Sequence, residues 1–192
     1  MPQAELFGAD YTLATLMRVG DAMKDIPLLR FDLSKCPLPD SCADAIVALN
    51  VLEHIEADEA ALAHCYRALR PAGIPVLEVP HGPELFDDYD RELMHFRRYR
   101  IAELSAMCAR QGFKILSRSH TGFLLYPAFL LSKKLSKRQS GKGAKLGVVE
   151  RSIEWSAYFN KLGDVAMSSE DLLRKFVYLP VGIRCSLVCG KD

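Results

Sequence analysis

The stretch ADAIVALNVLEH, residues 43–54, carries the strongest strand signal of the chain. Its apolar run ends at Asn50 and includes Ile46 and Val47, whose branched side chains favour a buried strand. Residues 56–70 then show apolar residues at helical spacing. A strand that leads straight into an amphipathic helix is the repeating unit of a parallel α/β sheet.

The same alternation continues on both sides of this stretch. Upstream, apolar runs at residues 6–10 and 27–32 end in an acid, and a helical pattern lies between them at residues 12–19. Downstream, the expected elements are strands at 74–79, 113–117 and 182–189 and a helix at 101–111. Strands that alternate with helices of this length predict an α/β fold with a doubly wound, mostly parallel sheet.

The composition fits one globular domain. Hydrophobic residues make up 49% and charged residues 26% of the 192 residues, which disfavours disorder and coiled coils. We therefore expect a single domain over residues 1–192, with an insertion at about 120–175 before the last strand. The net charge of +1 gives no electrostatic reason to expect nucleic-acid binding.

The cysteines and histidines do not follow the spacing of a metal site. None of the six cysteines forms a C-x-x-C pair, and no histidine pair complements them at ligand spacing, so we expect no metal. The first residues lack the charged and apolar regions of an export signal, which predicts a cytoplasmic protein with reduced thiols.

Three polar residues follow the first three predicted strands: Asp10, Asp32 and Asn50. Open α/β sheets bind ligands across the carboxyl ends of their strands. A carboxylate offers only hydrogen-bond acceptors, so Asp10 suits a ribose diol and Asp32 suits the amine of an adenine. Each Asp can equally be the N-cap of the helix that follows it, and the residues alone leave both interpretations open.

Several motifs together resemble those of the class I S-adenosylmethionine-dependent methyltransferases. The resemblance is to their small-molecule branch, the methyltransferases of types 11 and 12. The central motifs of that family match residues 31–33, 37–40, 43–47 and 50–54. Its turn before strand five matches residues 66–73, and its H-x-R-x-Y, E-L and G-F signature matches residues 95–99, 103–104 and 111–113. The resemblance implies a Rossmann-like fold with an antiparallel last strand and S-adenosylmethionine as the cofactor.

The resemblance also implies roles for individual residues. Asp10, with Tyr11 beside it, matches the acid that holds the ribose hydroxyls, and Asp32 and Leu33 match the adenine contacts. Asn50 and Val51 match the family's residues that lie below the methionine moiety and the sulfonium of the cofactor. Binding of the cofactor is thus expected along the ends of three strands.

The residues after Val51 are expected on the acceptor side. Methyl transfer to a hydroxyl needs a base, and His54 and His95 are the candidates. The alternative for His54, which the residues favour, is that it only caps or orients the next helix. Glu53, Arg97 and Arg98 are candidates for binding the acceptor, the arginines through an anionic group. A structural alternative is that the arginines pair with the acids at residues 87–92.

One motif of the family has no counterpart in these 192 residues. The family begins with a strand that leads into E-x-G-x-G-x-G, and this strand, loop and helix need about 30 residues, whereas only a few precede Asp10. The strand would lie between those that end at Asp10 and Asn50. A start codon assigned too late, a truncated chain or a degenerate protein would each explain this, and we favour the first.

The predicted function is methyl transfer from S-adenosylmethionine to an oxygen or nitrogen of a small or lipid-linked molecule, with activity of the truncated form left open. A catalytically dead binding or scaffold protein is the alternative. An NAD-dependent oxidoreductase is disfavoured because G-x-G-x-x-G is absent. Residues 122–138 combine apolar bulk with a basic flank, which suits either peripheral membrane contact or a packed helix, and a homo-oligomer is conceivable.

Overall fold

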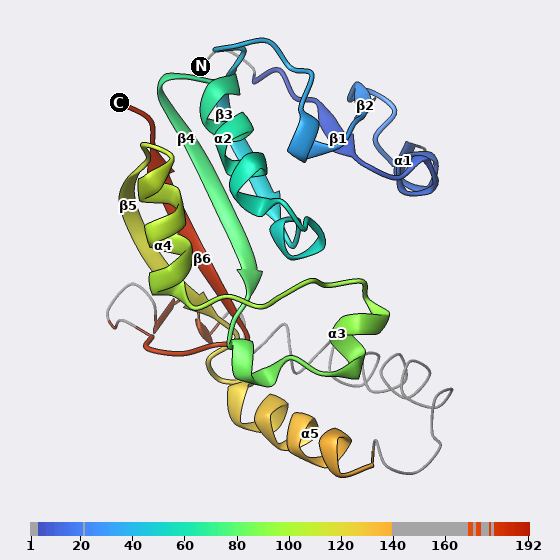
Figure 1. Ribbon diagram of the computed structural model, residues 1–192, viewed down its shortest axis with the longest axis vertical. Coiled ribbons are helices and arrows are strands. Elements are labelled where there is room, and N and C mark those ends of the chain that lie inside the picture. Colours follow the sequence, from blue (N-terminus) through green and yellow to red (C-terminus); the bar gives the residue numbers. More distant parts are fainter. Residues whose placement is uncertain (1–3, 21, 140–168, 171, 174–176, 178) are drawn as a thin grey trace.

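The computed structural model describes most of the chain, and Figure 1 shows its path. The described residues are 4–20, 22–139, 169–170, 172–173, 177 and 179–192. Much of the insertion predicted at about 120–175 therefore lies outside the described residues, namely 140–168, 171 and 174–176.

The strands of the described part form two sheets. In the smaller sheet, β1 (Gly8–Asp10) pairs in parallel with β2 (Leu28–Arg30). The larger sheet has the order β3-β4-β6-β5 and consists of β3 (Ala43–Leu49), β4 (Leu69–Pro80), β5 (Lys114–Thr121) and β6 (Arg184–Gly190). β3 and β4 are parallel, whereas β6 runs antiparallel to both β4 and β5. The predicted α/β fold and its antiparallel last strand are thus confirmed.

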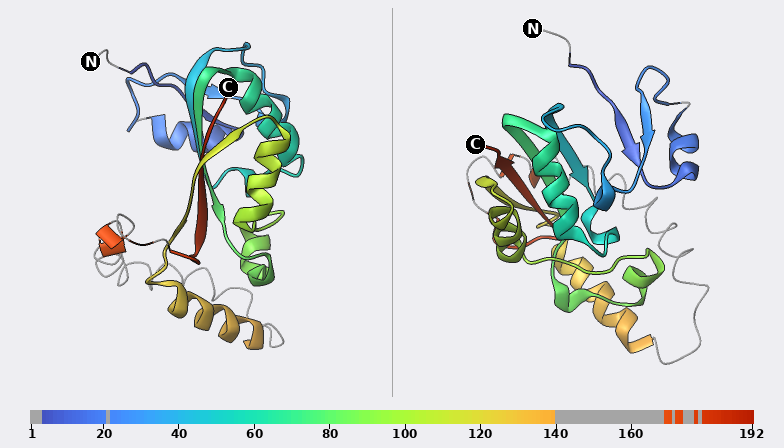
Figure 2. Two further views of the ribbon diagram at one scale, coloured as in Figure 1. Left: turned by 90° about the vertical axis from the view of Figure 1, so that its left-hand side faces the viewer. Right: turned by 45° about the horizontal axis from the view of Figure 1, so that its top comes forward.

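The helices lie on one face of the larger sheet, beside the smaller sheet, and near one end of the larger sheet. α2 (Asp58–Ala68) and α4 (Ile101–Arg110) lie on the same face of the larger sheet (Figure 1 and Figure 2). α1 (Leu13–Gly20) lies beside the smaller sheet, and α3 (Asp88–Glu92) and α5 (Tyr126–Gln139) lie near the end of the larger sheet where β4 finishes. Short 3-10 turns follow β2, β3 and β4: η1 (Leu33–Lys35), η2 (Leu52–His54) and η3 (Pro83–Leu85).

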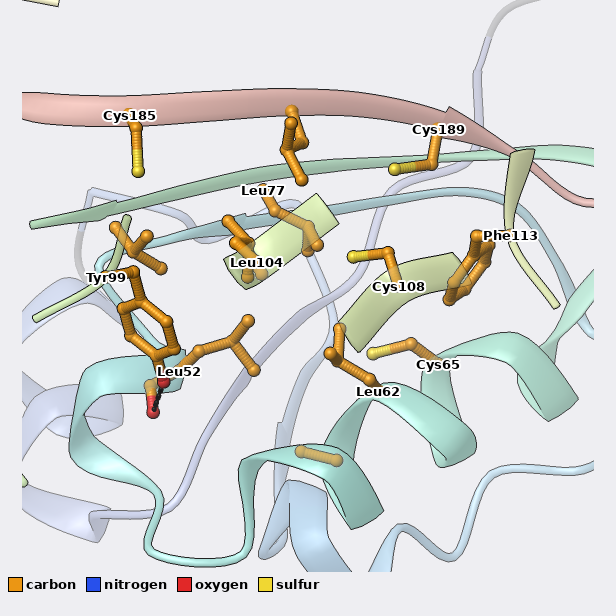
Figure 3. Packing of buried hydrophobic residues seen from close by; sticks show 14 of the residues in the cluster. Leu52, Leu62, Cys65, Leu77, Tyr99, Leu104, Cys108, Phe113, Cys185 and Cys189 are labelled. Carbon is orange, nitrogen blue, oxygen red and sulfur yellow. Dashed lines mark hydrogen bonds between the residues drawn. The ribbon is translucent and has the colours of Figure 1, made fainter. Parts of the chain in front are cut away.

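The main hydrophobic core lies between the larger sheet and the helices α2 and α4 (Figure 3). Cys185, Leu187 and Cys189 of β6 point into it, because side chains along a strand alternate between its two faces. Leu62 from α2 and Leu104 from α4 belong to the same core cluster, and none of these five side chains is exposed. Each fully buried leucine contributes about 1.5–3 kcal/mol to folding. This packing fixes the sheet against its helices and holds the strand ends in place.

The turn between α2 and β4 differs from the sequence prediction. The sequence predicts a helix that runs to Arg70 and a strand that begins at Ile74, but α2 ends at Ala68 and β4 begins at Leu69. Pro71 explains the early end, because the residue before a proline is confined to extended backbone. The order of the predicted strands and helices is otherwise that of the structure.

β1 and β3 each have an edge without a strand partner among the described residues. β1 pairs only with β2, and β3 pairs only with β4. On β3 this leaves apolar side chains in solvent, since Val47 is 66% and Leu49 52% exposed. These are the two strands between which the family resemblance places an absent strand, and the absence of that motif from the protein stays a prediction.

Candidate functional site

The carboxylate of Asp10 lies at the end of β1. Its Oδ1 accepts hydrogen bonds from the backbone N–H and from the hydroxyl of Thr12, both at 2.7 Å. Asp10 is not the N-cap of α1, which begins at Leu13, but these contacts hold the turn that leads into the helix. The second oxygen, Oδ2, has no hydrogen-bond partner in the described part of the chain. Asp10 therefore holds its turn with one oxygen and presents the other.

Asp32 repeats this arrangement at the end of the next strand. Its Oδ1 accepts from the backbone N–H of Ser34 at 2.8 Å and from the Ser34 hydroxyl at 2.7 Å. The hydroxyl and then the backbone N–H of Ser34 lower the pKa of Asp32 from its ordinary value, so the group is a carboxylate at neutral pH. Its Oδ2 likewise has no hydrogen-bond partner among the residues that the structure describes.

The two aspartates lie at the same edge of the smaller sheet. Asp10 pairs in register with Arg30, and its carbonyl accepts from the backbone N–H of Phe31 at 3.3 Å. Tyr11 is 67% exposed beside Asp10, while Leu33 packs against the main core and so links this edge to the larger sheet. The four residues predicted to contact adenosine are therefore neighbours in the structure.

Asn50 and Val51 lie at the end of β3 in the larger sheet. Asn50 has a φ of 53°, a left-handed conformation that asparagine tolerates better than most residues. Its backbone N–H donates to the carbonyl of Glu78 in β4 at 2.8 Å, which fixes the turn into η2. The cofactor residues predicted from the sequence thus fall into two groups, one on each sheet.

Glu53, His54 and His95 come together, although they were predicted separately. Each offers a ligand atom, and these atoms all lie within 4.8 Å of one another. The rings of His54 and His95 meet edge to face with centroids 4.6 Å apart. Glu53 is fully buried, and this burial raises its pKa to about 7. A buried acid beside two imidazoles at the end of β3 can exchange protons or bind a cation.

Asp90 of α3 holds His95 in place. Its Oδ1 lies 3.2 Å from His95 Nδ1 and accepts from Arg98 Nε at 2.8 Å, while its Oδ2 lies 3.1 Å from Lys133 Nζ. Burial alone would raise the pKa of Asp90, but the hydrogen bond and charge of Arg98, together with Lys133, hold it well below its usual range. Lys133 also contacts Asp87 at 2.7 Å, which ties α5 to α3.

The arginines make ion pairs within the protein. Arg98 pairs with Asp90, in agreement with the structural alternative, whereas Arg97 pairs with Asp58 of α2 at 2.9 Å, which the sequence did not suggest. The side chain of Arg97 is 38% exposed and that of Arg98 only 6%. Tyr99, the last residue of the H-x-R-x-Y match, donates from its hydroxyl to Asp58 at 2.8 Å, a contact that the sequence did not predict. Of the two predicted acceptor-binding arginines, Arg97 is the accessible one.

α5 contains most of the stretch predicted to contact a membrane. Leu124 is 42% and Leu131 60% exposed, but Lys133 of the basic flank is only 6% exposed because it contacts Asp87 and Asp90. Among the described residues, the helices are all too short or too polar to span a bilayer.

The chain is similar in sequence to known methyltransferases. A family model described as a methyltransferase domain matches residues 2–77. A probable S-adenosylmethionine-dependent methyltransferase of Mycolicibacterium smegmatis is 29% identical over 112 residues, which is 57% of this chain and 44% of that protein. The match thus spans less than half the length of this relative.

Solved structures show the same fold at low sequence identity. Phosphoethanolamine N-methyltransferase 2 of Haemonchus contortus, in complex with S-adenosyl-L-methionine, has a TM-score of 0.61 at 17% identity and covers 98% of this chain and 43% of its own. An S-adenosylmethionine-dependent methyltransferase from Mesorhizobium loti has a TM-score of 0.60 at 16% identity, covering 98% of this chain and 81% of its own.

Proposed function

We propose that this chain, which is similar to S-adenosylmethionine-dependent methyltransferases, transfers the methyl group of S-adenosylmethionine to an oxygen or nitrogen of a small or lipid-linked molecule. The cofactor is the one that its relatives use. The acceptor and the activity of this chain are the proposed part, since the match covers less than half of the curated relative.

One observation carries the proposal: two adjacent parallel strands are each followed closely by an aspartate, one of whose oxygens has no hydrogen-bond partner among the described residues. Oδ1 of Asp10 and of Asp32 is used by the following turn, and Oδ2 is available in both. In the proposed complex, Oδ2 of Asp10 accepts from the ribose hydroxyls and Oδ2 of Asp32 accepts from the adenine amine. Tyr11 and Leu33 would lie against the same nucleoside.

The methionine half of the cofactor would lie at the end of β3. Asn50 and Val51 are proposed to line it from below. The glycine-rich motif that lines the other side in the family does not occur in these 192 residues. Within the part of the chain that the structure describes, β1 and β3 each have one edge without a strand partner, which supports the proposal that a further strand completes this half.

The acceptor is proposed to approach from the side of η2. As its oxygen bonds to the methyl carbon and the carbon–sulfur bond breaks, the acceptor hydroxyl must lose a proton. His54 and His95 are the proposed proton acceptors, and with the proton of His95 on Nδ1, facing Asp90, its Nε2 has a free lone pair. Arg97 would hold an anionic group of the acceptor, and the exposed side chains of Leu124, just before α5, and Leu131, within it, would contact a lipid-linked one.

The strand edges that lack a partner among the described residues also favour the second candidate, a protein that keeps the fold as a binding or scaffold module. Titration calorimetry with S-adenosylmethionine and S-adenosylhomocysteine separates the two, on this chain and on a version extended by the in-frame upstream codons. The methyltransferase proposal predicts binding by at least the extended form, followed by methyl transfer to an added acceptor. Absence of binding in both forms would refute it and leave the scaffold role. The predicted cytoplasmic location and homo-oligomer stay predictions.

A further inference from the structure

A three-residue cluster at the end of β3 combines the ligand types of a transition-metal site. Glu53 and His54 come from η2, and His95 comes from the segment that follows α3. Their ligand atoms all lie within 4.8 Å of one another. Two imidazoles and one carboxylate are the protein ligands of several catalytic zinc sites and of the non-haem iron triad.

Glu53 would supply the negative charge of the metal site. The residue is fully buried, and neither Oε1 nor Oε2 has a hydrogen-bond partner in the described part of the chain. A buried acid without partners destabilises a fold strongly, because both oxygens lose their water. A cation bound between Glu53 and the two histidines would satisfy the carboxylate and offset this cost.

His95 is oriented for coordination. Its Nδ1 lies 3.2 Å from Oδ1 of Asp90, which places the ring proton on that side and leaves Nε2 as the ligand atom. Asp90 is itself held by Arg98 at 2.8 Å and by Lys133 at 3.1 Å. Histidine ligands of metals commonly donate their second N–H to a carboxylate in this way.

The two segments that supply the ligands are also tied to each other. The backbone N–H of Phe96 donates to the carbonyl of Glu53 at 2.7 Å, and the hydroxyl of Tyr99 lies 3.1 Å from the carbonyl of Leu52. Arg97 adds a hydrogen bond to the carbonyl of Glu56 at 2.8 Å. The ligands are therefore held on a fixed frame, as metal sites require.

We propose that Glu53, His54 and His95 bind one divalent transition-metal ion of the zinc class. His54 is the exposed member of the cluster, so solvent or a ligand oxygen reaches the ion from that side. The sequence predicted no metal, because the ligands come from two segments far apart in the chain. Binding of the ion does not depend on the proposed function. A coordinated imidazole nitrogen cannot accept a proton, so with metal bound the ion would assist loss of the acceptor proton in place of the histidines.

The test uses the purified chain, stripped with a chelator, and Co²⁺ and Zn²⁺ as probes. Absorption spectroscopy follows Co²⁺ binding, and calorimetry follows Zn²⁺ binding, both without S-adenosylmethionine. We expect one ion per chain, a visible cobalt spectrum of nitrogen and oxygen ligation, and at least about tenfold weaker binding in Glu53→Gln, His54→Ala and His95→Ala. His64→Ala, which removes a histidine of α2 outside the cluster, is the matched control and should bind like the wild type.

His54 is exposed, so His54→Ala tests the site even if the variants of the buried residues do not fold, and circular dichroism checks folding. Saturable binding that the three cluster variants do not weaken would overturn the proposal. So would intense sulfur-to-cobalt charge-transfer bands, which would assign the ion to cysteines, or the absence of saturable binding. Since no cofactor is present, each of these results bears on the metal site alone and leaves the methyltransferase proposal to its own test.

Discussion

Replacing Asp90 by asparagine removes the negative charge at the centre of the contacts between α3, α5 and the segment that carries His95. The carboxylate is fully buried and lies 2.8 Å from Arg98 and 3.1 Å from Lys133. The neutral amide of the variant cannot balance these two buried cations. Lys133 keeps one partner, because Asp87 lies 2.7 Å from its ammonium group.

The magnitude follows from the burial of the ion pairs. Loss of one partner of a buried pair costs about 3–5 kcal/mol, because the other charge is left without compensation in a medium of low dielectric constant. We expect a loss in the free energy of unfolding of about 3–5 kcal/mol for Asp90→Asn. Such a loss is a large part of the roughly 5–15 kcal/mol that stabilises a typical domain.

Asp88→Asn is the matched control. Asp88 lies in the same short helix, but its pair with Arg91 is exposed, with side chains 66% and 64% accessible, so we expect a loss of at most about 1 kcal/mol. Urea unfolding followed by far-ultraviolet circular dichroism measures both values. Equal losses in the two variants, or a loss below about 1 kcal/mol for Asp90→Asn, would refute the reasoning.

Three further predictions concern the core and its titratable groups. Burial lowers the pKa of His120 in the folded protein, so the stability that neutral His120 contributes is present above about pH 6.5 and is lost as the pH falls through the folded pKa. The urea midpoint of the wild type should therefore fall between about pH 7 and pH 5, and His120→Asn should make this fall smaller. An unchanged pH profile in the variant would contradict this. Burial raises the pKa of Cys65 to about 12, so iodoacetamide at neutral pH should label half-buried Cys42 first by mass spectrometry, and equal rates would be inconsistent. Leu104→Ala should cost about 2–5 kcal/mol in urea unfolding, and Leu116→Ala, at a position 54% exposed, within about 0.5 kcal/mol; similar losses would argue against the core as described.

The order of strands and helices follows from local patterns in the sequence. Apolar runs that end in Asp10, Asp32 and Asn50 predict three strands, and β1, β2 and β3 end at or just before these residues. The end of α2 is less predictable, because it depends on how Pro71 restricts its neighbour, and the sequence pattern alone extends the helix too far.

The composition of the site depends on contacts between distant segments. No local pattern indicates that His95 meets His54, or that Arg97 pairs with Asp58 across the fold. Burial of Glu53 is equally hidden, because a charged residue after a strand is ordinarily expected in solvent. Tertiary packing decides these positions, and it is not encoded in the periodicity of any one segment.

The central claim is that the end of the smaller sheet binds the adenosine of the cofactor, and Asp10→Ala tests it most directly. Calorimetric titration with S-adenosylhomocysteine compares the wild type, Asp10→Ala and Thr12→Val. It uses whichever form, this chain or the version extended by the upstream codons, binds S-adenosylhomocysteine. Thr12→Val removes the hydroxyl bonded to Oδ1 but keeps the carboxylate, so it controls for loss of the turn. We predict near wild-type affinity for Thr12→Val and at least about tenfold weaker binding for Asp10→Ala, as expected for a hydrogen bond to a charged group. Unchanged affinity in Asp10→Ala would contradict the account.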